Sequence, residues 1–242
     1  MPERPAVHSE RDGSVATVTL AHGERNLLDP EVMGELCDAI AAVDADPEAL
    51  AIVLTATGET FCGGLDLEAL QNGGDPIEFA TALVRVLKLM PALDTALVGA
   101  VNGDALASGF SIVCACDLVI AVPEARLGTF EASIGIWPMI AQVPPLQRLL
   151  PRHALQNIIT GVPFSAEEAL RFGAINRIVP AERLRDVAYE LAASASSAGP
   201  ALKAGRKSFY RFVDLPYEQA LDQAFDAFTR MFHASRRAAD DG

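Results

Sequence analysis

Two buried apolar runs in this chain each lead through a glycine-bearing loop directly into a helix-like segment. The first is Leu50–Thr55, followed by the loop 57–66, and the second is Leu97–Val101, followed by 102–109. Each junction should present free backbone N–H groups at the start of a helix, where the aligned peptide dipoles favour negative charge. Two such junctions close in space could bind one carbonyl oxygen and stabilise it as it becomes an oxyanion.

Strand and helix patterns alternate through the first half of the chain. The segments 6–10 and 14–20 read as a hairpin, and Asp29-Pro30 and Asp75-Pro76 each open an amphipathic helix, because aspartate caps a helix and proline suits its first position. We expect further strands at 50–55, 97–101 and 118–122, and helices at 30–44, 76–90 and 109–116. This order implies βαβ crossovers and a mainly parallel sheet.

Helices dominate after about Pro144. We expect them at 144–150, 152–160, 165–172, 181–197, 201–212 and 216–236, with a turn at 194–200 and one short strand at 174–179. The last helix carries an apolar stripe of Leu221, Phe225, Phe228 and Phe232. We favour docking of this stripe onto the chain's own core, with packing against a neighbouring subunit as the alternative.

Composition limits the classes of partner. The chain has 242 residues, half of them hydrophobic, and fits one domain with a large core. A formal charge of −13 argues against nucleic acid or an anionic membrane as the main partner. No signal-peptide core and no membrane-spanning run is visible, and Cys37, Cys62, Cys114 and Cys116 lack metal-site spacing. We expect a reduced, cytoplasmic protein without a metal.

Four segments, in the right order and spacing, resemble the crotonase superfamily, also called the enoyl-CoA hydratase/isomerase family. Thr60–Leu67 and Val101–Ser111 are similar to its two oxyanion segments. The stretch from Ala125 to Pro138 resembles its catalytic-glutamate segment, and Thr160–Pro180 resembles a later signature. The similarity covers nearly the whole chain.

The resemblance implies an α/β fold with a ClpP/crotonase-like repeated ββα spiral core and a C-terminal helical trimerisation region. Residues 1–190 would form the acyl-CoA-binding core, and 191–242 the helical oligomerisation region. It further implies a homotrimer or a dimer of trimers that acts on an acyl-CoA thioester. No cofactor is expected, because coenzyme A is part of the substrate.

Carried over position by position, the backbone N–H groups of Leu65 and Ser108 would be the oxyanion donors, although the family's second donor is usually a glycine. Hydratases of the family hold water between two glutamates, and the matching positions here are Ser111 and Glu131. Ser111 could orient a water or a substrate group but cannot exchange protons as a carboxylate does. The resemblance also implies substrate contacts at Arg25, Leu27, Cys62, Gly64, Leu65, Asp66, Leu67, Ser108, Gly109 and Trp137.

One carboxylate and an oxyanion hole suffice to shift a double bond, so we favour isomerisation of a 3-enoyl-CoA to a 2-enoyl-CoA. Burial near Trp137 should raise the pKa of Glu131 and make it a usable base and acid near neutrality. One alternative is an enoyl-CoA hydratase in which Ser111 positions water; another is a catalytically weak acyl-CoA-binding protein. A remote alternative is a serine hydrolase that uses Ser108, although Leu106 and Phe110 stand where a nucleophile elbow has glycines.

Other charged residues allow two interpretations each. Asp66 is more often a helix cap than an acid at such a position, and Asp117 would hold a loop. Lys203, Arg206 and Lys207 could meet the nucleotide phosphates of coenzyme A, or they could form a solvated helix face.

Overall fold

A six-stranded sheet forms the centre of the molecule. The computed structural model describes the backbone of residues 5–240 and the side chains of 5–199 and 201–232. The strand order is β1-β2-β3-β5-β7-β10; β1 and β2 form the expected antiparallel hairpin, and every other pair is parallel. The strands are β1 (Val7–Asp12), β2 (Val15–Leu20), β3 (Ala51–Ala56), β5 (Ala96–Val101), β7 (Leu118–Ala121) and β10 (Arg177–Ile178).

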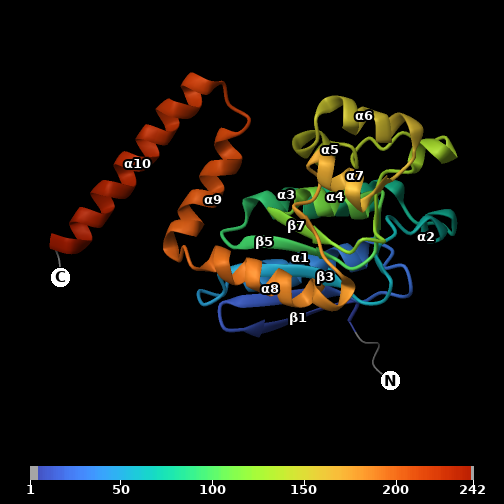
Figure 1. The fold of residues 1–242 in the computed structure, drawn as a ribbon, viewed down its shortest axis with the longest axis horizontal. Helices are drawn as coiled ribbons and strands as arrows, with labels where there is room; N and C mark the ends of the chain where they lie inside the picture. Colours follow the sequence, from blue (N-terminus) through green and yellow to red (C-terminus); the bar gives the residue numbers. More distant parts are fainter. Residues whose placement is uncertain (1–4, 241–242) are drawn as a thin grey trace.

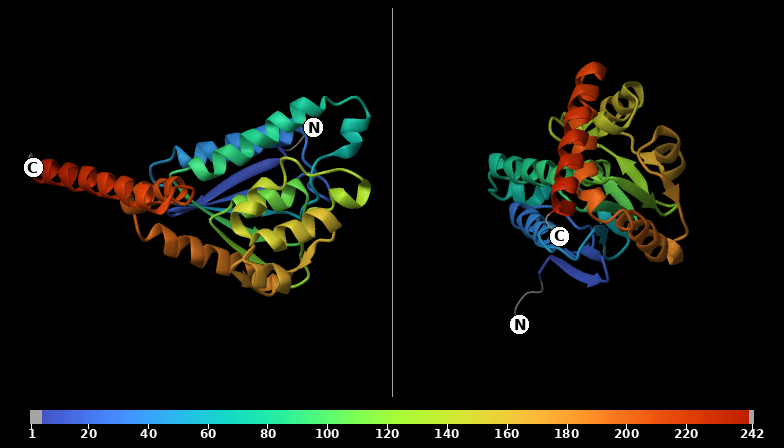
Figure 2. Two further views of the ribbon diagram at one scale, coloured as in Figure 1. Left: turned by 90° about the horizontal axis from the view of Figure 1, so that it is seen from above. Right: turned by 90° about the vertical axis from the view of Figure 1, so that its left-hand side faces the viewer.

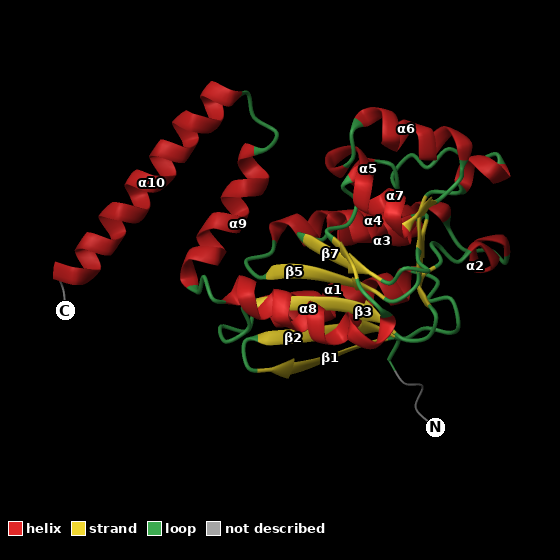
Figure 3. Cartoon of the chain, in the orientation of Figure 1, coloured by secondary structure: helices red, strands yellow, loops and turns green. Residues whose placement is uncertain are grey.

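A second sheet of four short strands stands at the carboxyl ends of β3, β5 and β7 (Figure 3). It holds β4 (Thr60–Cys62), β6 (Asp104–Leu106), β8 (Arg126–Gly128) and β9 (Phe164–Ser165), with only β8 and β9 antiparallel. Along the chain, a long strand of the first sheet, a short strand of the second and a helix follow one another three times. The predicted repeated ββα core is therefore confirmed.

Helices cover both faces of the six-stranded sheet (Figures 1 and 2). Helices α1 and α3 pack together on one face and α8 packs on the other. The caps form as expected, because Asp29 accepts a hydrogen bond from Val32 N–H and Asp75 accepts one from Ile77 N–H. The helices are α1 (Pro30–Asp44), α2 (Leu67–Gln71), α3 (Pro76–Ala92), α4 (Ser108–Ala115), α5 (Val143–Arg148), α6 (Pro151–Thr160), α7 (Ala166–Phe172), α8 (Ala181–Ser196), α9 (Pro200–Phe212) and α10 (Tyr217–Asp240).

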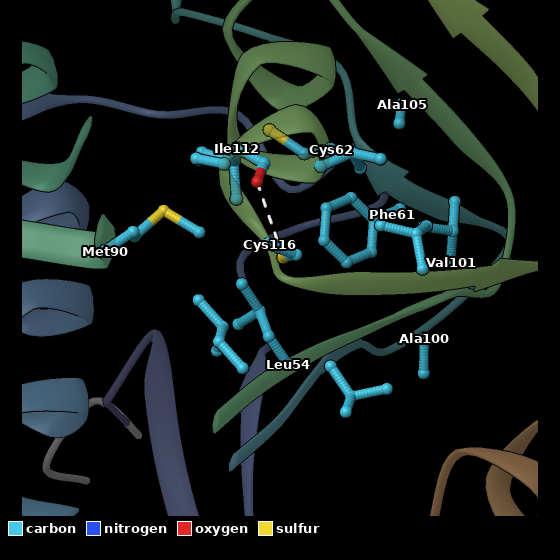
Figure 4. Close-up of a cluster of buried hydrophobic side chains, with 14 of the residues drawn as sticks. Leu54, Phe61, Cys62, Met90, Ala100, Val101, Ala105, Ile112 and Cys116 are labelled. Atoms are coloured by element: carbon cyan, nitrogen blue, oxygen red, sulfur yellow. Dashed lines mark hydrogen bonds between the residues drawn. The ribbon is translucent and has the colours of Figure 1, made fainter. Parts of the chain in front are cut away.

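Helix α4 lies inside the molecule, and all of its side chains are buried. Ile112 of α4 lies in the same apolar cluster as Phe61, Cys62 and Met90, from the second sheet and from α3 (Figure 4). This packing explains why the sequence of α4 is apolar all round instead of striped. A helix buried in this way can hold its amino-terminal residue in one place.

The expected strand at 174–179 is shorter than predicted and keeps only Arg177–Ile178. The side chain of Asn176 accepts a hydrogen bond from Val119 N–H at 2.7 Å. The side chain of Asn176 thus binds the Val119 N–H that the backbone of a longer β10 would use. The backbone pairing of β10 with β7 is therefore short. The turn expected at 194–200 is also shorter, because α8 continues to Ser196.

Helix α10 corrects the favoured interpretation of the last apolar stripe. It packs on α9 and extends away from the sheets (Figures 1 and 2), and Phe225 and Phe228 are 70% and 57% exposed. The loop after α9 turns the chain back alongside α9, so the stripe cannot reach the core. Docking of the stripe onto the chain's own core is therefore wrong.

The expected boundary between residues 190 and 191 falls inside α8, which packs on the six-stranded sheet. The division into a core and an oligomerisation region stays a prediction, with α9 and α10 as the helices that leave the core. Among residues 5–240, no helix combines the length and the apolar content that a membrane span requires.

Candidate active site

A cavity of about 270 Å³ lies where α2, α3, the start of α4 and the segment 130–141 meet. Its wall is apolar, and among its described lining residues Glu131 is the only one with an ionisable carboxyl or basic group. The lining residues are Leu65, Leu67, Leu70, Pro76, Ala80, Leu83, Ala107, Ser108, Phe130, Glu131, Ile134, Ile136, Trp137, Pro138, Met139, Ile140 and Ala141. The structure thus brings Leu65, Ser108 and Glu131 to one cavity.

The first wall of the cavity is the loop after β4. The loop is held by a ladder of backbone hydrogen bonds, from Gly63 N–H to Arg25 O at 2.8 Å, and from Leu28 N–H to Gly64 O at 2.9 Å. Gly64 has φ +99°, and a Cβ there would lie 2.8 Å from Ala107 Cβ and 3.7 Å from Ser108 N. Only glycine allows this approach, which sets the peptide of Leu65 beside that of Ser108.

The second wall is the amino terminus of α4. Ala107, which precedes the helix, has φ +51° and ψ −120°, a conformation that a residue with a side chain rarely adopts. Ser108 is the first helical residue, so its N–H has no partner inside the helix. Within residues 5–240, neither Leu65 N–H nor Ser108 N–H donates a hydrogen bond, so both remain available to a ligand oxygen.

Two further glycines allow close backbone contacts around this junction. A Cβ at Gly103 would lie 1.8 Å from Glu59 O, and one at Gly109 would lie 2.5 Å from Cys62 O. Both distances are far below contact, so any side chain would force the two junctions apart. Gly109 allows close packing between β4 and the start of α4, and Gly103 allows it between the segments that precede β6 and β4; neither glycine has a positive φ.

Glu131 begins a short 3-10 helix, Glu131–Ile134, directly after β8 and its following loop. Burial raises the pKa of the Glu131 carboxyl above its ordinary value, while backbone N–H groups, including that of Phe130, oppose the shift. Phe130 N–H donates to Glu131 Oε2 at 2.9 Å, which orients the carboxyl. A carboxyl whose pKa is raised in an apolar cavity can both remove and return a proton, which is what acid/base catalysis requires.

Asn157 of α6 holds the chain just before Glu131, a role that sequence reasoning missed. Its Oδ1 accepts hydrogen bonds from Thr129 N–H and from Thr129 Oγ1, and its Nδ2 donates to Thr129 O and Val162 O. Asn157 is 1% exposed, so it is a buried amide that satisfies a strand end. A polar residue within a helical pattern gives no signal of such a contact.

Ser111 lies behind the cavity wall instead of in it. The residue is 0% exposed, and Ser111 Oγ donates to Ala141 O at 2.7 Å, with Ala107 O at 3.3 Å. A hydroxyl has one proton, and the backbone takes it. The structure therefore does not support a Ser111 that positions a substrate water.

Leu67 and Trp137, two of the expected substrate contacts, line the cavity, and Trp137 Nε1 donates to Gln142 Oε1 at 3.1 Å. Leu65 and Ser108 line it as well, and the remaining expected substrate-contacting positions are not among the lining residues. Arg25 is exposed and Leu27 half-buried on the strip that pairs with the oxyanion loop, and Asp66 caps α2 by accepting from Ala69 N–H. Cys62, Gly64 and Gly109 form the contact between β4 and α4.

Asn26 is a second residue whose role was missed, next to Arg25. It has φ +48° and is fully buried. Its Oδ1 accepts from His22 N–H, and its Nδ2 donates to Thr57 O and Thr60 O. Asn26 thereby ties the strip 25–28 to both ends of the loop that precedes β4.

The basic cluster on α9 does not form one solvated face. Arg206 is 7% exposed and makes a bidentate pair with Asp117, at 2.7 Å and 2.9 Å. Asp117 also accepts from Leu97 N–H and from Tyr210 Oη, so it holds a loop as expected. Lys207 pairs with Asp94 at 2.8 Å. Arg206 is therefore unavailable to the phosphates of a ligand.

Among the residues whose side chains the structure describes, no histidine is placed to act as the base of a serine hydrolase at this cavity. Among the side chains that the structure describes (5–199 and 201–232) and their backbone, the Ser108 hydroxyl has no hydrogen-bond partner. None of the histidines whose side chains are described lines the cavity. His153, for example, stacks on Phe172 at a centroid distance of 3.8 Å.

Comparisons with known proteins agree with this geometry. Residues 10–240 match the enoyl-CoA hydratase/isomerase family. The chain is 32% identical to the carnitinyl-CoA dehydratase of Escherichia coli strain K12 over 219 residues, 89% of this chain and 84% of that protein. It is 33% identical to the carnitinyl-CoA dehydratase of Salmonella enteritidis PT4 over 218 residues, 88% of this chain and 84% of that protein.

Solved structures show the same fold. An enoyl-CoA hydratase subunit I from Geobacillus kaustophilus superposes with a TM-score of 0.86 at 28% identity, covering 94% of this chain and 90% of its own. An enoyl-CoA hydratase/isomerase family protein from Silicibacter pomeroyi gives 0.87 at 25% identity, covering 93% and 99%. With its ββα core and a cavity that joins two free amides to one carboxyl, the chain belongs to the enoyl-CoA hydratase/isomerase family, as an enzyme acting on acyl-CoA.

Proposed function

We propose that the chain isomerises an enoyl-CoA by moving its double bond from position 3 to position 2. The observation that carries the proposal is the single carboxyl, Glu131, in an apolar cavity that also presents Leu65 N–H and Ser108 N–H. Proton transfer at one face of an enolate needs one acid/base group and one oxyanion site, and the cavity holds that set.

The reaction follows from these groups. The thioester oxygen would accept hydrogen bonds from Leu65 N–H and Ser108 N–H, and the Glu131 carboxylate would remove a proton from C2 of the 3-enoyl-CoA. The electron pair spreads over the dienolate, and protonated Glu131 returns the proton to C4, which leaves a 2-enoyl-CoA. A single oxyanion donor elsewhere is worth about 2.7–4 kcal/mol of barrier.

Hydration or dehydration is the second candidate, because relatives that share about a third of the sequence are named carnitinyl-CoA dehydratases. Adding or removing water at a double bond normally uses two acid/base groups. The lining supplies one, and the Ser111 hydroxyl is committed to Ala141 O. The cavity therefore favours isomerisation over water transfer.

Turnover of matched esters tests the proposal. Wild type should convert 3-enoyl-CoA to 2-enoyl-CoA faster than it forms 3-hydroxyacyl-CoA, and Glu131→Gln should lose activity by about a thousandfold, since acid/base catalysis contributes about 10²–10⁴. Glu124→Gln, at an exposed position, removes the same charge and should keep full activity. Faster release of 3-hydroxyacyl-CoA would establish the hydratase instead. Tight binding of all esters without turnover, unchanged in Glu131→Gln, would establish an acyl-CoA binder.

We also propose that the chain assembles as a homotrimer or a dimer of trimers through α9 and α10. The exposed stripe of Leu221, Phe225 and Phe228 supports an interface on this arm, since such residues rarely face water together in a monomer. A cytoplasmic location is proposed as well, supported by four cysteines that form no disulfide.

A further inference from the structure

Ser111 occupies one of the two positions that the family resemblance assigns to the glutamates of hydratases, and its contacts indicate a different role. Ser111 Oγ donates to Ala141 O at 2.7 Å and lies 3.3 Å from Ala107 O, and Ser111 N–H donates to the same Ala107 O at 3.2 Å. The side chain is fully buried. Ser111 is thus a link between the first turn of α4 and the cavity wall.

The carbonyl that Ser111 contacts belongs to the oxyanion peptide itself. Ala107 C=O and Ser108 N–H are parts of one planar trans peptide, so they point in opposite directions and turn together. Any group that holds Ala107 O on the inner side therefore sets the direction of Ser108 N–H on the cavity side.

The Ala107–Ser108 peptide keeps its orientation only through contacts with other parts of the chain. Ala107 has φ +51°, a conformation that persists only where surrounding contacts impose it. Ala107 N–H donates to Gly128 O at 2.9 Å, which fixes the preceding peptide, and Ser111 N–H donates to the carbonyl of the following one at 3.2 Å. The Ser111 hydroxyl, whose proton goes to Ala141 O, ties this turn of α4 to the segment 138–141. Ala141 is nearly buried, so without the Ser111 hydroxyl its carbonyl would lose a hydrogen-bond partner, which favours a shift of the segment 138–141.

We propose that Ser111 is a positioning residue that locks the Ala107–Ser108 peptide to the 138–141 wall and thereby aims Ser108 N–H at the thioester oxygen. The proposal rests on the proposed function, since it assumes that this N–H stabilises an enolate. It predicts a loss in enolate stabilisation that exceeds any loss in substrate binding.

Acetoacetyl-CoA tests this without turnover. Its enolate absorbs in the near ultraviolet, so titration with pH reports the pKa of the bound 3-oxoacyl group. Wild type should lower that pKa relative to the free ester. Ser111→Ala should reduce the enolate fraction about tenfold at a fixed pH, because one hydrogen bond contributes about 0.5–1.5 kcal/mol and 1.4 kcal/mol is a factor of ten. For the 3-enoyl-CoA, kcat should fall by a similar factor while KM stays within about threefold.

Ser196→Ala is the matched control. Ser196 is also a buried serine, and its Oγ donates to Ala193 O at 2.8 Å on α8, outside the cavity. It should lose thermal stability as Ser111→Ala does but keep the wild-type enolate pKa and kcat. Ser111→Cys keeps a weak donor of similar size and should give an intermediate enolate fraction, which carries the test if Ser111→Ala does not fold.

The possible outcomes distinguish a failure of the proposed function from a failure of the positioning role of Ser111. A wild type that binds acetoacetyl-CoA without lowering its pKa overturns the oxyanion site, and with it the proposed function. A wild type that lowers the pKa while Ser111→Ala and Ser111→Cys lower it equally overturns the positioning role alone. A fall in kcat with an unchanged enolate pKa also overturns it, because the defect would then lie in proton transfer.

Discussion

The raised pKa of Glu131 makes a prediction about stability. A carboxyl whose pKa is higher in the folded than in the unfolded chain adds stability below its unfolded pKa, and this is lost as pH rises through the folded pKa. Glu131→Gln removes the ionised form and should therefore raise the unfolding temperature above that window, relative to wild type. The gain should disappear as the pH falls below the pKa of the unfolded chain, because both states then bind the proton. Thermal melts across pH measure it, and a gain that grows toward low pH would contradict it.

The position of Glu131 in a family-like segment predicted an acid/base group, and the structure supplies the cause of its raised pKa, burial in an apolar wall with Phe130 N–H on one oxygen. Asn26 and Asn157 escaped prediction because their partners are carbonyls far away in the sequence. The direction of the Ser111 hydroxyl escaped it for the same reason.

Elements were predictable where local chemistry sets their ends. Asp29 and Asp75 cap their helices within the chain segment that predicted them. The start of β10 was not predictable, because the side chain of Asn176, the residue before it, accepts from the backbone of β7 in a tertiary contact. The closeness of β4 and α4 is another tertiary property, visible in the sequence only as glycines.

Two glycine substitutions should act in opposite directions at the element scale. Gly109→Ala would push a Cβ against Cys62 O and Cys62 Cβ, and should cost about 1–3 kcal/mol as overpacking while lowering kcat. Gly34→Ala, inside α1 with nothing within 4 Å, should instead gain about 0.5–1 kcal/mol. Urea unfolding of both variants measures the difference, and equal effects would show that the β4–α4 contact is not tight.

At the scale of the whole molecule, buried and half-buried polar side chains of α9 attach the arm formed by α9 and α10 to the core. Arg206 donates to Met90 O, Pro91 O and Leu93 O at the end of α3, besides its pair with Asp117. Burial raises the pKa of Tyr210 to about 12, so its hydroxyl stays protonated and donates to Asp117. The sequence showed the cations of α9 but not which one turns inward.

Replacing Arg206 should lower the free energy of unfolding far more than replacing its neighbour Lys207. Arg206→Leu leaves Asp117 without its cation and should lower the free energy of unfolding by about 3–5 kcal/mol. Lys207→Leu breaks an exposed pair on the same helix and should cost no more than about 1 kcal/mol. Denaturant titration separates the two, and similar costs would contradict a structural role for Arg206.

Assembly belongs to the same scale. Phe225→Asp places a charge in the middle of the exposed stripe of α10 and should shift the protein to monomers in light-scattering chromatography. Gln219→Asp adds the same charge to the same helix away from that stripe and should leave the assembly intact. A monomeric wild type would contradict the proposed assembly through the exposed stripe of α10.

The contact between Cys62 and α4 makes the reactivity of the Cys62 thiol a measure of local opening near the oxyanion site. Burial raises the pKa of the Cys62 thiol to about 12, and a Cβ on Gly109 would lie 3.0 Å from its sulfur. An alkylating reagent can meet this sulfur as a thiolate only when the chain opens around it. The labelling rate of Cys62 therefore reports how often the contact between β4 and α4 opens. A ligand that binds the N–H groups of Leu65 and Ser108 should slow the labelling.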